Sequence, residues 1–181
     1  MRIITGEFRG RKLISPPTKD VRPTTDRVKE AIFSILAPEI ADAVVLDLFA
    51  GSGSLGIEAI SRGAKHVYFC DNSEKSISVI RQNIVKLGIS DRVTIANCDF
   101  KRISSRITKK VDIVLIDAPY NMCEYADILM SLKNGEFLAD PATILIERDK
   151  SKGGYEVPAP FALHKVKKYG NTEVDILVYN E

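Results

Sequence analysis

The sequence predicts an α/β protein whose mostly parallel sheet ends in an antiparallel hairpin and is preceded by a small N-terminal extension of one hairpin and one helix. From residue 43 onward, apolar strand patterns alternate with amphipathic helix patterns, as in proteins whose parallel sheet is covered on both faces. Residues 162–168 and 173–179 are strand-like and flank Tyr169-Gly-Asn-Thr172, a hairpin signal. The first 40 residues lack this alternation, so we expect an extension over residues 1–40 and a main domain over residues 41–181.

The extension combines a short hairpin with one helix. Residues 2–5 and 12–15 flank a glycine-containing turn, which indicates the hairpin. A helix follows, because Thr24 or Thr25 can cap its first turn and apolar residues then recur at helical spacing. The apolar stripe consists of Val28, Ala31, Ile32, Ile35 and Leu36.

Charge is unevenly distributed along the chain. Residues 1–30 contain eight Lys or Arg and four Asp or Glu, whereas the remaining residues contain 18 and 20. The extension is therefore basic, although the net charge of the whole chain is only +2. A basic arm on a near-neutral body favours a polyanionic partner, with an ordinary solvated surface as the alternative.

The main domain repeats strand and helix along its length. Its strand patterns are continuous apolar runs, which are expected when both faces of a parallel sheet are buried. They cover residues 43–48, 66–70, 93–96, 112–116 and 142–147. Helix patterns run from a glycine-rich turn to about residue 62, over residues 73–87, and over roughly 124–132.

Composition sets the class of protein. The 181 residues suit one ordinary domain, and 45% hydrophobic with 28% charged residues is typical of a soluble globular chain. The three cysteines form no CxxC pair, so we expect neither a disulfide framework nor a metal site. The N-terminus lacks an apolar signal segment, and no run approaches the roughly 18 apolar residues of a membrane span. We therefore expect a cytoplasmic protein that does not contact a membrane.

A glycine-rich turn follows the first strand of the main domain. Gly51-Ser-Gly-Ser-Leu-Gly56 matches the nucleotide-binding pattern G-x-G-x-x-G and opens a helix. Asp71 ends the next strand, 20 residues after Gly51, where a carboxylate accepts hydrogen bonds from ribose hydroxyls. These features do not separate a dinucleotide from S-adenosylmethionine as the ligand.

Asp47 favours S-adenosylmethionine. It lies four residues before Gly51, where a carboxylate would match poorly with a pyrophosphate, which needs N–H donors and positive charge. S-adenosylmethionine has no phosphate and carries an ammonium and a sulfonium. At an effective dielectric of about 20, unit charges about 4 Å apart attract by roughly 4 kcal/mol before desolvation. The alternative is that Asp47 caps the following helix, a role for which Ser52 and Ser54 are better placed.

Asp99-Phe100 ends the third strand region. Ligand contacts in such a sheet come from the carboxyl ends of the strands. Asp99 can accept a hydrogen bond from the adenine amino group while Phe100 packs on the ring. The alternative role of Asp99 is to cap the helix that follows.

Asp117-Ala-Pro-Tyr120 ends the fourth strand and suits methylation of an exocyclic base amine. Such an amine is a poor nucleophile, because its lone pair is delocalised into the ring. The Asp117 carboxylate and the Ala118 carbonyl can hold the two amino hydrogens and direct the lone pair, so that positioning promotes transfer. Pro119 fixes the turn, and Tyr120 can stack on the base for about 1–3 kcal/mol. An ordinary strand-end turn is the alternative.

On these residues the chain resembles the class I S-adenosylmethionine-dependent methyltransferases and, more narrowly, the bacterial 16S ribosomal RNA guanine-N2 methyltransferase family of the RsmD type. The resemblance covers nearly the whole chain. The segments that carry it are Arg2-Ile-Ile-Thr-Gly-Glu-Phe-Arg-Gly-Arg-Lys12, Arg22-Pro-Thr-Thr-Asp-Arg-Val-Lys-Glu-Ala-Ile-Phe33, Leu46-Asp-Leu-Phe-Ala-Gly-Ser-Gly53 and Tyr169-Gly-Asn-Thr172. Generic methyltransferases lack the second of these.

The resemblance implies a Rossmann-like, seven-stranded sheet that ends in a reversed hairpin. It also implies transfer of one methyl group from S-adenosylmethionine, leaving S-adenosylhomocysteine, to N2 of a guanine in 16S rRNA of the 30S subunit. We expect a monomer. The cofactor-binding residues that we expect are Asp47, Phe49, Ala50, Gly51, Ser52, Gly53, Asp71, Asn72, Asp99, Phe100 and Thr25.

The family turn is usually Asp-Pro-Pro-aromatic, and here Ala118 replaces the first proline. The role of that position is a backbone carbonyl, which alanine retains, so we keep the Asp117–Tyr120 turn as the catalytic site. The RNA-binding residues that we expect to contact phosphates are Arg9, Arg11, Lys12, Arg22 and Arg27. A second basic group, Lys101, Arg102, Arg106, Lys109 and Lys110, reads instead as a solvated helix face.

Three other functions remain open from the sequence. The Asp117–Tyr120 turn also permits an adenine-N6 methyltransferase acting on DNA or RNA. The glycine-rich turn permits an NAD-dependent oxidoreductase, but no Tyr-x-x-x-Lys or other hydride-transfer group accompanies it. A non-catalytic RNA-binding or assembly protein is the last alternative, and the intact Asp117 and Tyr120 argue against it.

Overall fold

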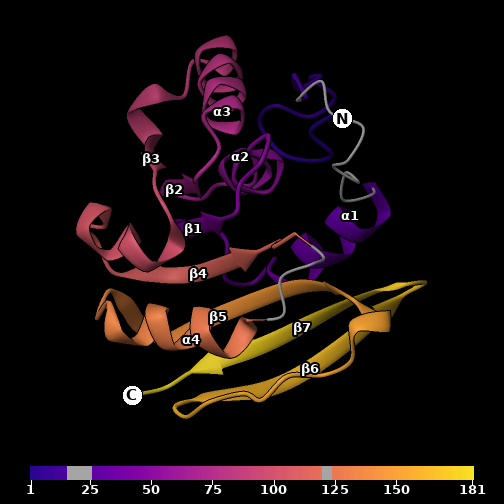
Figure 1. The fold of residues 1–181 in the computed structure, drawn as a ribbon. Coiled ribbons are helices and arrows are strands. Elements are labelled where there is room, and N and C mark those ends of the chain that lie inside the picture. The colour runs from indigo at the N-terminus through magenta and orange to yellow at the C-terminus, as the bar shows by residue number, and fades with distance from the viewer. Residues whose placement is uncertain (16–25, 120–123) are drawn as a thin grey trace.

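The computed structural model describes residues 1–15, 26–119 and 124–181. Seven strands of this part of the chain form one sheet in the order β3-β2-β1-β4-β5-β7-β6 (Figure 1). Neighbouring strands from β1 to β5 pair in parallel, whereas β7 is antiparallel to both β5 and β6. The strands are β1 (Val44–Leu48), β2 (His66–Asp71), β3 (Val93–Asn97), β4 (Val111–Ile116), β5 (Leu138–Asp149), β6 (Phe161–Tyr169) and β7 (Thr172–Tyr179). The predicted α/β class, seven-stranded sheet and final hairpin are confirmed.

Helices cover both faces of this sheet. On one face, α1 (Asp26–Ile35), α2 (Ser54–Ser61) and α3 (Glu74–Leu87) share a hydrophobic core with the inward side chains of the strands. On the other face, the short helix η2 (Phe100–Arg106) and α4 (Tyr125–Asn134) cover a second core cluster. Two further short helices are η1 (Ser90–Arg92) and η3 (Lys150–Lys152). The central strands β1, β2 and β4 are mostly apolar because each of them faces both clusters.

The order of the strands reverses between β1 and β4. From β1 the chain moves outward to β2 and β3, and it then returns to place β4 on the other side of β1. Ligands of open α/β sheets bind outside the carboxyl ends of the strands at this kind of reversal. The glycine-rich turn follows β1 and the Asp117 turn follows β4, so both predicted sites lie at this reversal.

The N-terminal hairpin that we predicted is reduced to a single antiparallel bridge between Arg2 and Lys12. The backbone N–H groups that would extend the ladder are used elsewhere. Those of Ile4 and Thr5 donate to the Glu58 carboxylate on α2. The segment is therefore held both by a few backbone hydrogen bonds of its own, such as Ile3 N–H to the Arg11 carbonyl, and by side chains of the main domain.

The buried face of α1 is rotated from the predicted stripe. Ala31 and Ile35, which we expected to be buried, are half-exposed, whereas Phe33 is fully buried. Lys29 is also fully buried, and its ammonium group pairs there with the Glu58 carboxylate on α2. The predicted capping residues Thr24 and Thr25 lie outside the described residues.

The extension and the main domain share one core. Ile3, Phe8 and Leu13 belong to the same cluster as the sheet and α1. The division at residue 40 stays a prediction. Cys70 and Cys98 are free thiols. Within the described ranges, no helix combines the length and the apolar character that crossing a bilayer requires.

Candidate functional site at the carboxyl end of the sheet

The glycine-rich turn takes backbone conformations that its sequence is suited to. Gly51 and Gly53 have φ of 56° and 77°, in the left-handed region that favours glycine. A Cβ on Gly56 would lie 2.3 Å from the Phe69 ring on β2, so this third glycine allows α2 to pack closely on the sheet. Phe49 also has a positive φ of 64°, which is strained for an aromatic residue and is typical of functional loops.

Asp47 lies beneath this turn and is 1% exposed. Its Oδ2 accepts the backbone N–H of Gly56 at 2.8 Å, so it does cap the start of α2. The expectation that Ser52 or Ser54 would take that role is wrong, since the N-cap position is Gly53 and no side chain bonds from it. Burial raises the pKa of Asp47 well above the usual aspartate range, and the neighbouring charges of Asp117 and Asp71 raise it further.

Three carboxylates therefore lie close together at the reversal of strand order. Asp47 is the penultimate residue of β1, Asp71 ends β2, and Asp117 follows β4. A site with three acidic groups and a desolvated carboxylate repels anions and favours a cation. This donor set fits an ammonium or sulfonium better than it fits a pyrophosphate.

Asp71 fixes the shape of the turn from the side. Its Oδ2 accepts the Gly51 N–H at 2.8 Å, and its Oδ1 accepts the Ser73 N–H at 2.8 Å. Each carboxylate oxygen has a further lone pair that a ribose hydroxyl can use. Asn72, the adjacent residue, is exposed at the same edge.

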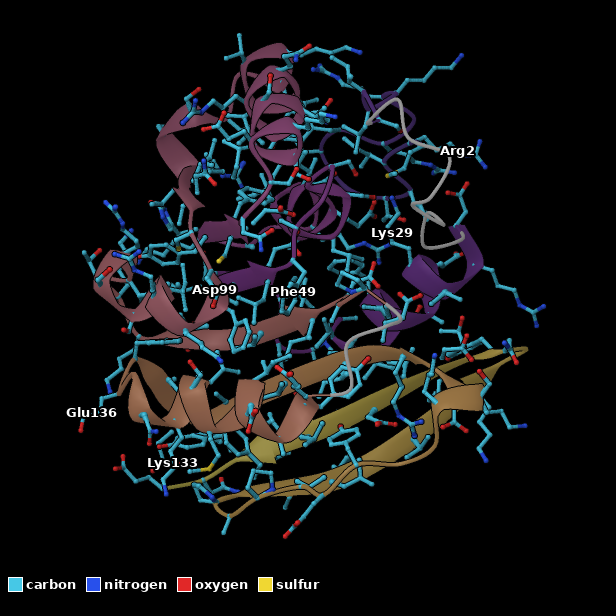
Figure 2. All side chains as sticks on the ribbon, in the orientation of Figure 1. Arg2, Lys29, Phe49, Asp99, Lys133 and Glu136 are labelled. Atoms are coloured by element: carbon cyan, nitrogen blue, oxygen red, sulfur yellow. The ribbon has the colours of Figure 1, made fainter. Side chains whose placement is uncertain are left out.

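Asp99 and Phe100 lie at the next strand end. Asp99 Oδ1 accepts the Lys101 N–H at 2.9 Å, so the capping role is confirmed and its ligand role stays a prediction. The rings of Phe100 and Phe49 lie 5.8 Å apart between centroids, which is contact distance for aromatic side chains. The pair forms an apolar wall where we expected the adenine ring (Figure 2 labels Phe49 and Asp99).

The remaining residues of the predicted catalytic turn surround the end of β4. Asp117 is half-buried, Ala118 is buried, and Pro119 is exposed. Leu48 pairs with Ile116 in the sheet, so the glycine-rich turn and the catalytic turn leave adjacent strands at the same level. Tyr120 lies outside the described residues.

The sequence analysis missed a buried ion pair that attaches α1 to α2. Lys29 Nζ donates to the Arg2 carbonyl at 2.7 Å and to Ser54 Oγ at 3.1 Å, and it lies 3.6 Å from Glu58 Oε2 (Figure 2). Both charged side chains are fully buried. Burial lowers the pKa of Lys29, against the attraction of Glu58 and Asp26. The signal was available, since Lys29 is spaced to share a helix face with buried positions three, four and seven residues later.

Asn83 was also missed. Its side chain is fully buried on α3, where Oδ1 accepts the Ile14 N–H at 2.8 Å. Its Nδ2 donates to the carbonyls of Ile14 at 3.0 Å and Ser52 at 3.1 Å. Asn83 therefore ties the N-terminal segment directly to the glycine-rich turn. The sequence offers only a weak sign of this, a polar residue within the apolar face of a helix.

The predicted RNA-binding residues of the extension are exposed where the structure describes them. Arg9, Arg11, Lys12 and Arg27 are exposed, and the Arg11 guanidinium lies 5.2 Å from the centre of the Phe8 ring. Arg22 and the predicted cofactor residue Thr25 lie outside the described residues. The second basic group is exposed, as we expected of a solvated face: Lys101, Arg102, Arg106, Lys109 and Lys110.

A pocket of about 500 Å³ lies away from the acidic groups and the glycine-rich turn. It is lined by Gly6, Phe33 and Arg62, at the end of α2 that is remote from the glycine-rich turn. The acidic groups and strained backbone described above are all at the opposite edge of the sheet. The chemistry therefore places the candidate site at that edge rather than in this pocket.

Comparison with known proteins identifies the family. The model of the family described as Conserved hypothetical protein 95 matches residues 1–178. The chain belongs to this family. It is 36% identical over 170 residues to Ribosomal RNA small subunit methyltransferase D of Escherichia coli, with 94% of this chain and 85% of the relative covered. A protein of the same name from Haemophilus influenzae is 37% identical over 158 residues, with 84% and 80% covered. The resemblance to the RsmD type is confirmed.

Solved structures agree with the fold. The Escherichia coli protein yhhF, provisionally named a methyltransferase, has a TM-score of 0.89 at 33% identity, with 99% of this chain and 98% of that chain covered. TrmN from Thermus thermophilus has a TM-score of 0.67 at 23% identity, with 85% and 48% covered, and shows likeness of fold alone. The chain is a Rossmann-like methyltransferase in fold and family.

Proposed function

We propose that this chain transfers a methyl group from S-adenosylmethionine to the exocyclic N2 of a guanine in 16S rRNA. The observation that carries the proposal is the meeting of two turns at the reversal of strand order. The glycine-rich turn leaves β1, the Asp117 turn leaves the adjacent β4, and Leu48 pairs with Ile116 immediately before them. Relatives named small-subunit rRNA methyltransferases support the substrate class.

The proposed cofactor site is formed by the ends of β1, β2 and β3, which we call the cofactor half of the carboxyl edge. S-adenosylmethionine supplies a methyl group activated by a sulfonium. Asp47 and its acidic neighbours offer negative charge to the cationic end of this ligand. The free lone pairs of Asp71 would accept the ribose hydroxyls, and the Phe49–Phe100 wall would pack on the adenine. Ala50, Ser52 and Asn72 complete the lining, and the donor set requires no metal.

The substrate site of the proposal is the end of β4. Asp117 and the Ala118 carbonyl would accept the two hydrogens of the guanine amine, which directs its lone pair along the line of attack. Transfer would join the methyl group to the amine nitrogen in place of its bond to sulfur, and the proton that the nitrogen gives up would pass to the Asp117 carboxylate that already accepts it. Pro119 restrains the turn, and Tyr120 would stack on the base. Most of the acceleration is positioning, which suits a site with few reactive groups.

The extension supplies the proposed RNA-binding surface. Arg9, Arg11, Lys12 and Arg27 are exposed cations, and Arg22 would join them. Contacts to phosphates are sensitive to salt and blind to sequence, so they bind the RNA while the Asp117 turn selects the base. We propose that the chain acts on the 30S particle in the cytoplasm, as a monomer.

The test is transfer of a labelled methyl group from S-adenosylmethionine to 30S particles that lack the modification, followed by nucleoside analysis. We expect label in N2-methylguanine. Label in N6-methyladenine would show that the target base is adenine rather than guanine. Binding of S-adenosylhomocysteine with no transfer to the particles would overturn the proposed substrate.

A further inference from the structure

Strand β6 and the segment before it carry a concentration of positive charge. Residues 150–168 contain five lysines against one glutamate. Lys168 pairs with Glu173 at 3.4 Å and is set aside. The other four form what we call the hairpin lysine surface, in which Lys150, Lys152 and Lys165 are exposed and Lys167 is half-buried.

The register of the sheet places part of this surface level with the catalytic turn. Ile116 pairs with Ile146, so the next residue of each strand, Asp117 and Glu147, also stand side by side. Glu147 pairs with Val174, and Val174 pairs with Lys167. Residues paired across a sheet point to the same face, so this row crosses the sheet from Asp117 to Lys167 on one side.

Glu147 and Val174 are buried, so this row gives the level of Lys167 relative to Asp117 and is not itself a surface for RNA. Three strand spacings of about 4.8 Å separate β4 from β6, which gives about 14 Å. At a rise of about 3.4 Å per nucleotide in a stacked strand, that distance corresponds to about four nucleotides. Helix α1 lies over the same face, since its buried residues cluster with Leu145 and Val174.

The other two lysines lie at the carboxyl edge itself. η3 begins where β5 ends, and the Lys150 N–H donates to the Asn171 carbonyl in the hairpin turn at 2.9 Å. Asp149 pairs with Thr172, which puts the turn and η3 two residues beyond Glu147. Figure 1 shows η3 and α1 on the same side of the molecule, at the right-hand ends of β4 and β5.

We propose that the hairpin lysine surface binds phosphates of the RNA on the side of the target nucleotide opposite the glycine-rich turn. This inference rests on the proposed function. Lysines on an edge strand also prevent edge-to-edge pairing of sheets, which alone would account for Lys165 and Lys167. That explanation does not extend to Lys150 and Lys152, which belong to a helix.

The experiment measures RNA affinity as a function of salt for two double variants, Lys165→Gln/Lys167→Gln and Lys150→Gln/Lys152→Gln. The matched control is Lys65→Gln/Lys109→Gln, because both of these lysines are exposed and precede β2 and β4 at the opposite edge of the sheet. The probes are labelled, deproteinised 16S RNA and 30S particles that lack the methyl group. Melting temperatures confirm that all variants are folded.

Each hairpin variant is expected to reduce the slope of log affinity against log salt by about 1.4–1.8, the amount for two lost phosphate contacts. At about 100 mM KCl, the dissociation constant should rise at least about fivefold, with the control unchanged in both measures. Slopes equal to those of the wild type, or equal losses in the control, overturn the inference. Loss of affinity for 30S particles but not for naked RNA also overturns it and assigns the surface to a ribosomal protein. Absence of methyl transfer by the wild type would instead count against the proposed function, because the slopes are read from binding alone.

Discussion

The cofactor half of the carboxyl edge and the substrate half, formed by the ends of β4, β5 and β7, hold their charged groups in different ways. In the cofactor half, Asp47 accepts the N–H of Gly56, and Asp71 accepts that of Gly51. In the substrate half, the buried Arg148 pairs with two acidic side chains of β7. Backbone partners fix the shape of a loop locally, whereas side-chain partners depend on the register of strands distant in sequence. The comparison predicts that substitutions in the two halves have separable effects.

The largest expected effect is that of Asp117→Ala on methyl transfer. Loss of a group that orients the reacting amine should lower the rate about 100- to 1,000-fold, by analogy with the removal of one positioned hydrogen-bonding group. Affinity for S-adenosylhomocysteine should change less than about threefold. Single-turnover transfer and isothermal titration measure the two quantities.

The matched control for this variant is Asp127→Ala, because Asp127 is exposed on α4. It should leave both quantities unchanged. Equal loss of transfer and of cofactor affinity in Asp117→Ala would show that the two halves are not separable.

Lys29→Met should have the next largest effect, and it should reach both halves. It leaves the buried Glu58 with Arg62 as its remaining ion-pair partner, so the loss in the free energy of unfolding should be up to about 3 kcal/mol, the lower end for a buried pair that loses one member. Denaturant unfolding measures the loss, and Lys75→Met on the exposed surface of α3 is the control. Adding Glu58→Gln should recover part of the stability by removing the buried charge, although glutamine has one acceptor oxygen where Glu58 uses two for the N–H groups of Ile4 and Thr5. No recovery would mean that packing rather than charge is responsible.

Asp47→Asn should weaken cofactor binding and strengthen the ligand-free fold. Loss of the charge should reduce affinity for S-adenosylmethionine about 10- to 100-fold, the usual range for a hydrogen bond to a charged group. Because burial raises the pKa of Asp47, the folded wild type binds this proton more tightly than the unfolded chain does. The wild type therefore loses stability as the pH rises from the ordinary aspartate pKa to the raised one, and the variant does not.

The same pKa shift predicts how cofactor affinity depends on pH. Affinity of the wild type should increase as the pH is raised through the Asp47 pKa, above the usual aspartate range, because the carboxylate must be charged to attract a cation. Titration calorimetry over that range measures it. A pH dependence that persists in Asp47→Asn would assign the effect to another group.

The smallest expected effect is that of Arg9→Gln/Arg11→Gln on RNA binding. Each lost phosphate contact lowers the salt slope by about 0.7–0.9, and cofactor affinity should not change. Arg102→Gln/Arg106→Gln on η2 is the comparison, since we interpret that surface as solvated. Equal effects of the two pairs would show that RNA contacts both surfaces.

The cofactor half could be predicted from sequence because its signals are local. The glycine spacing, the acid before it and the acid at the end of the next strand all lie within 25 residues. Asp47 was nevertheless expected to act mainly as a ligand group, with helix capping as the alternative, because sequence does not show how deeply the end of the strand is buried. Asp47 rather than Ser54 caps the helix, and the Ser54 hydroxyl instead accepts a hydrogen bond from Lys29.

The extension was harder to predict because its partners are distant. The backbone of residues 4 and 5 bonds to Glu58, more than 50 residues away, and that of Ile14 bonds to Asn83, 69 residues away. Local pattern shows that residues 2–5 and 12–15 are extended but cannot show what satisfies their hydrogen bonds. Buried polar partners therefore shorten the expected ladder, in which Ile3 still bonds to Arg11 and Leu13 to Met1.

The left-handed backbone of Phe49 has a consequence for attempts to engineer this protein. An aromatic residue in that conformation costs about 1–2 kcal/mol, and glycine would relieve the strain. Glycine would also remove the ring that faces Phe100. A library screened for heat resistance would therefore weigh the relief of strain against the lost packing, whereas one screened for turnover would retain phenylalanine. Divergent outcomes of those two selections would mark position 49 as one where the fold and the activity have opposing requirements.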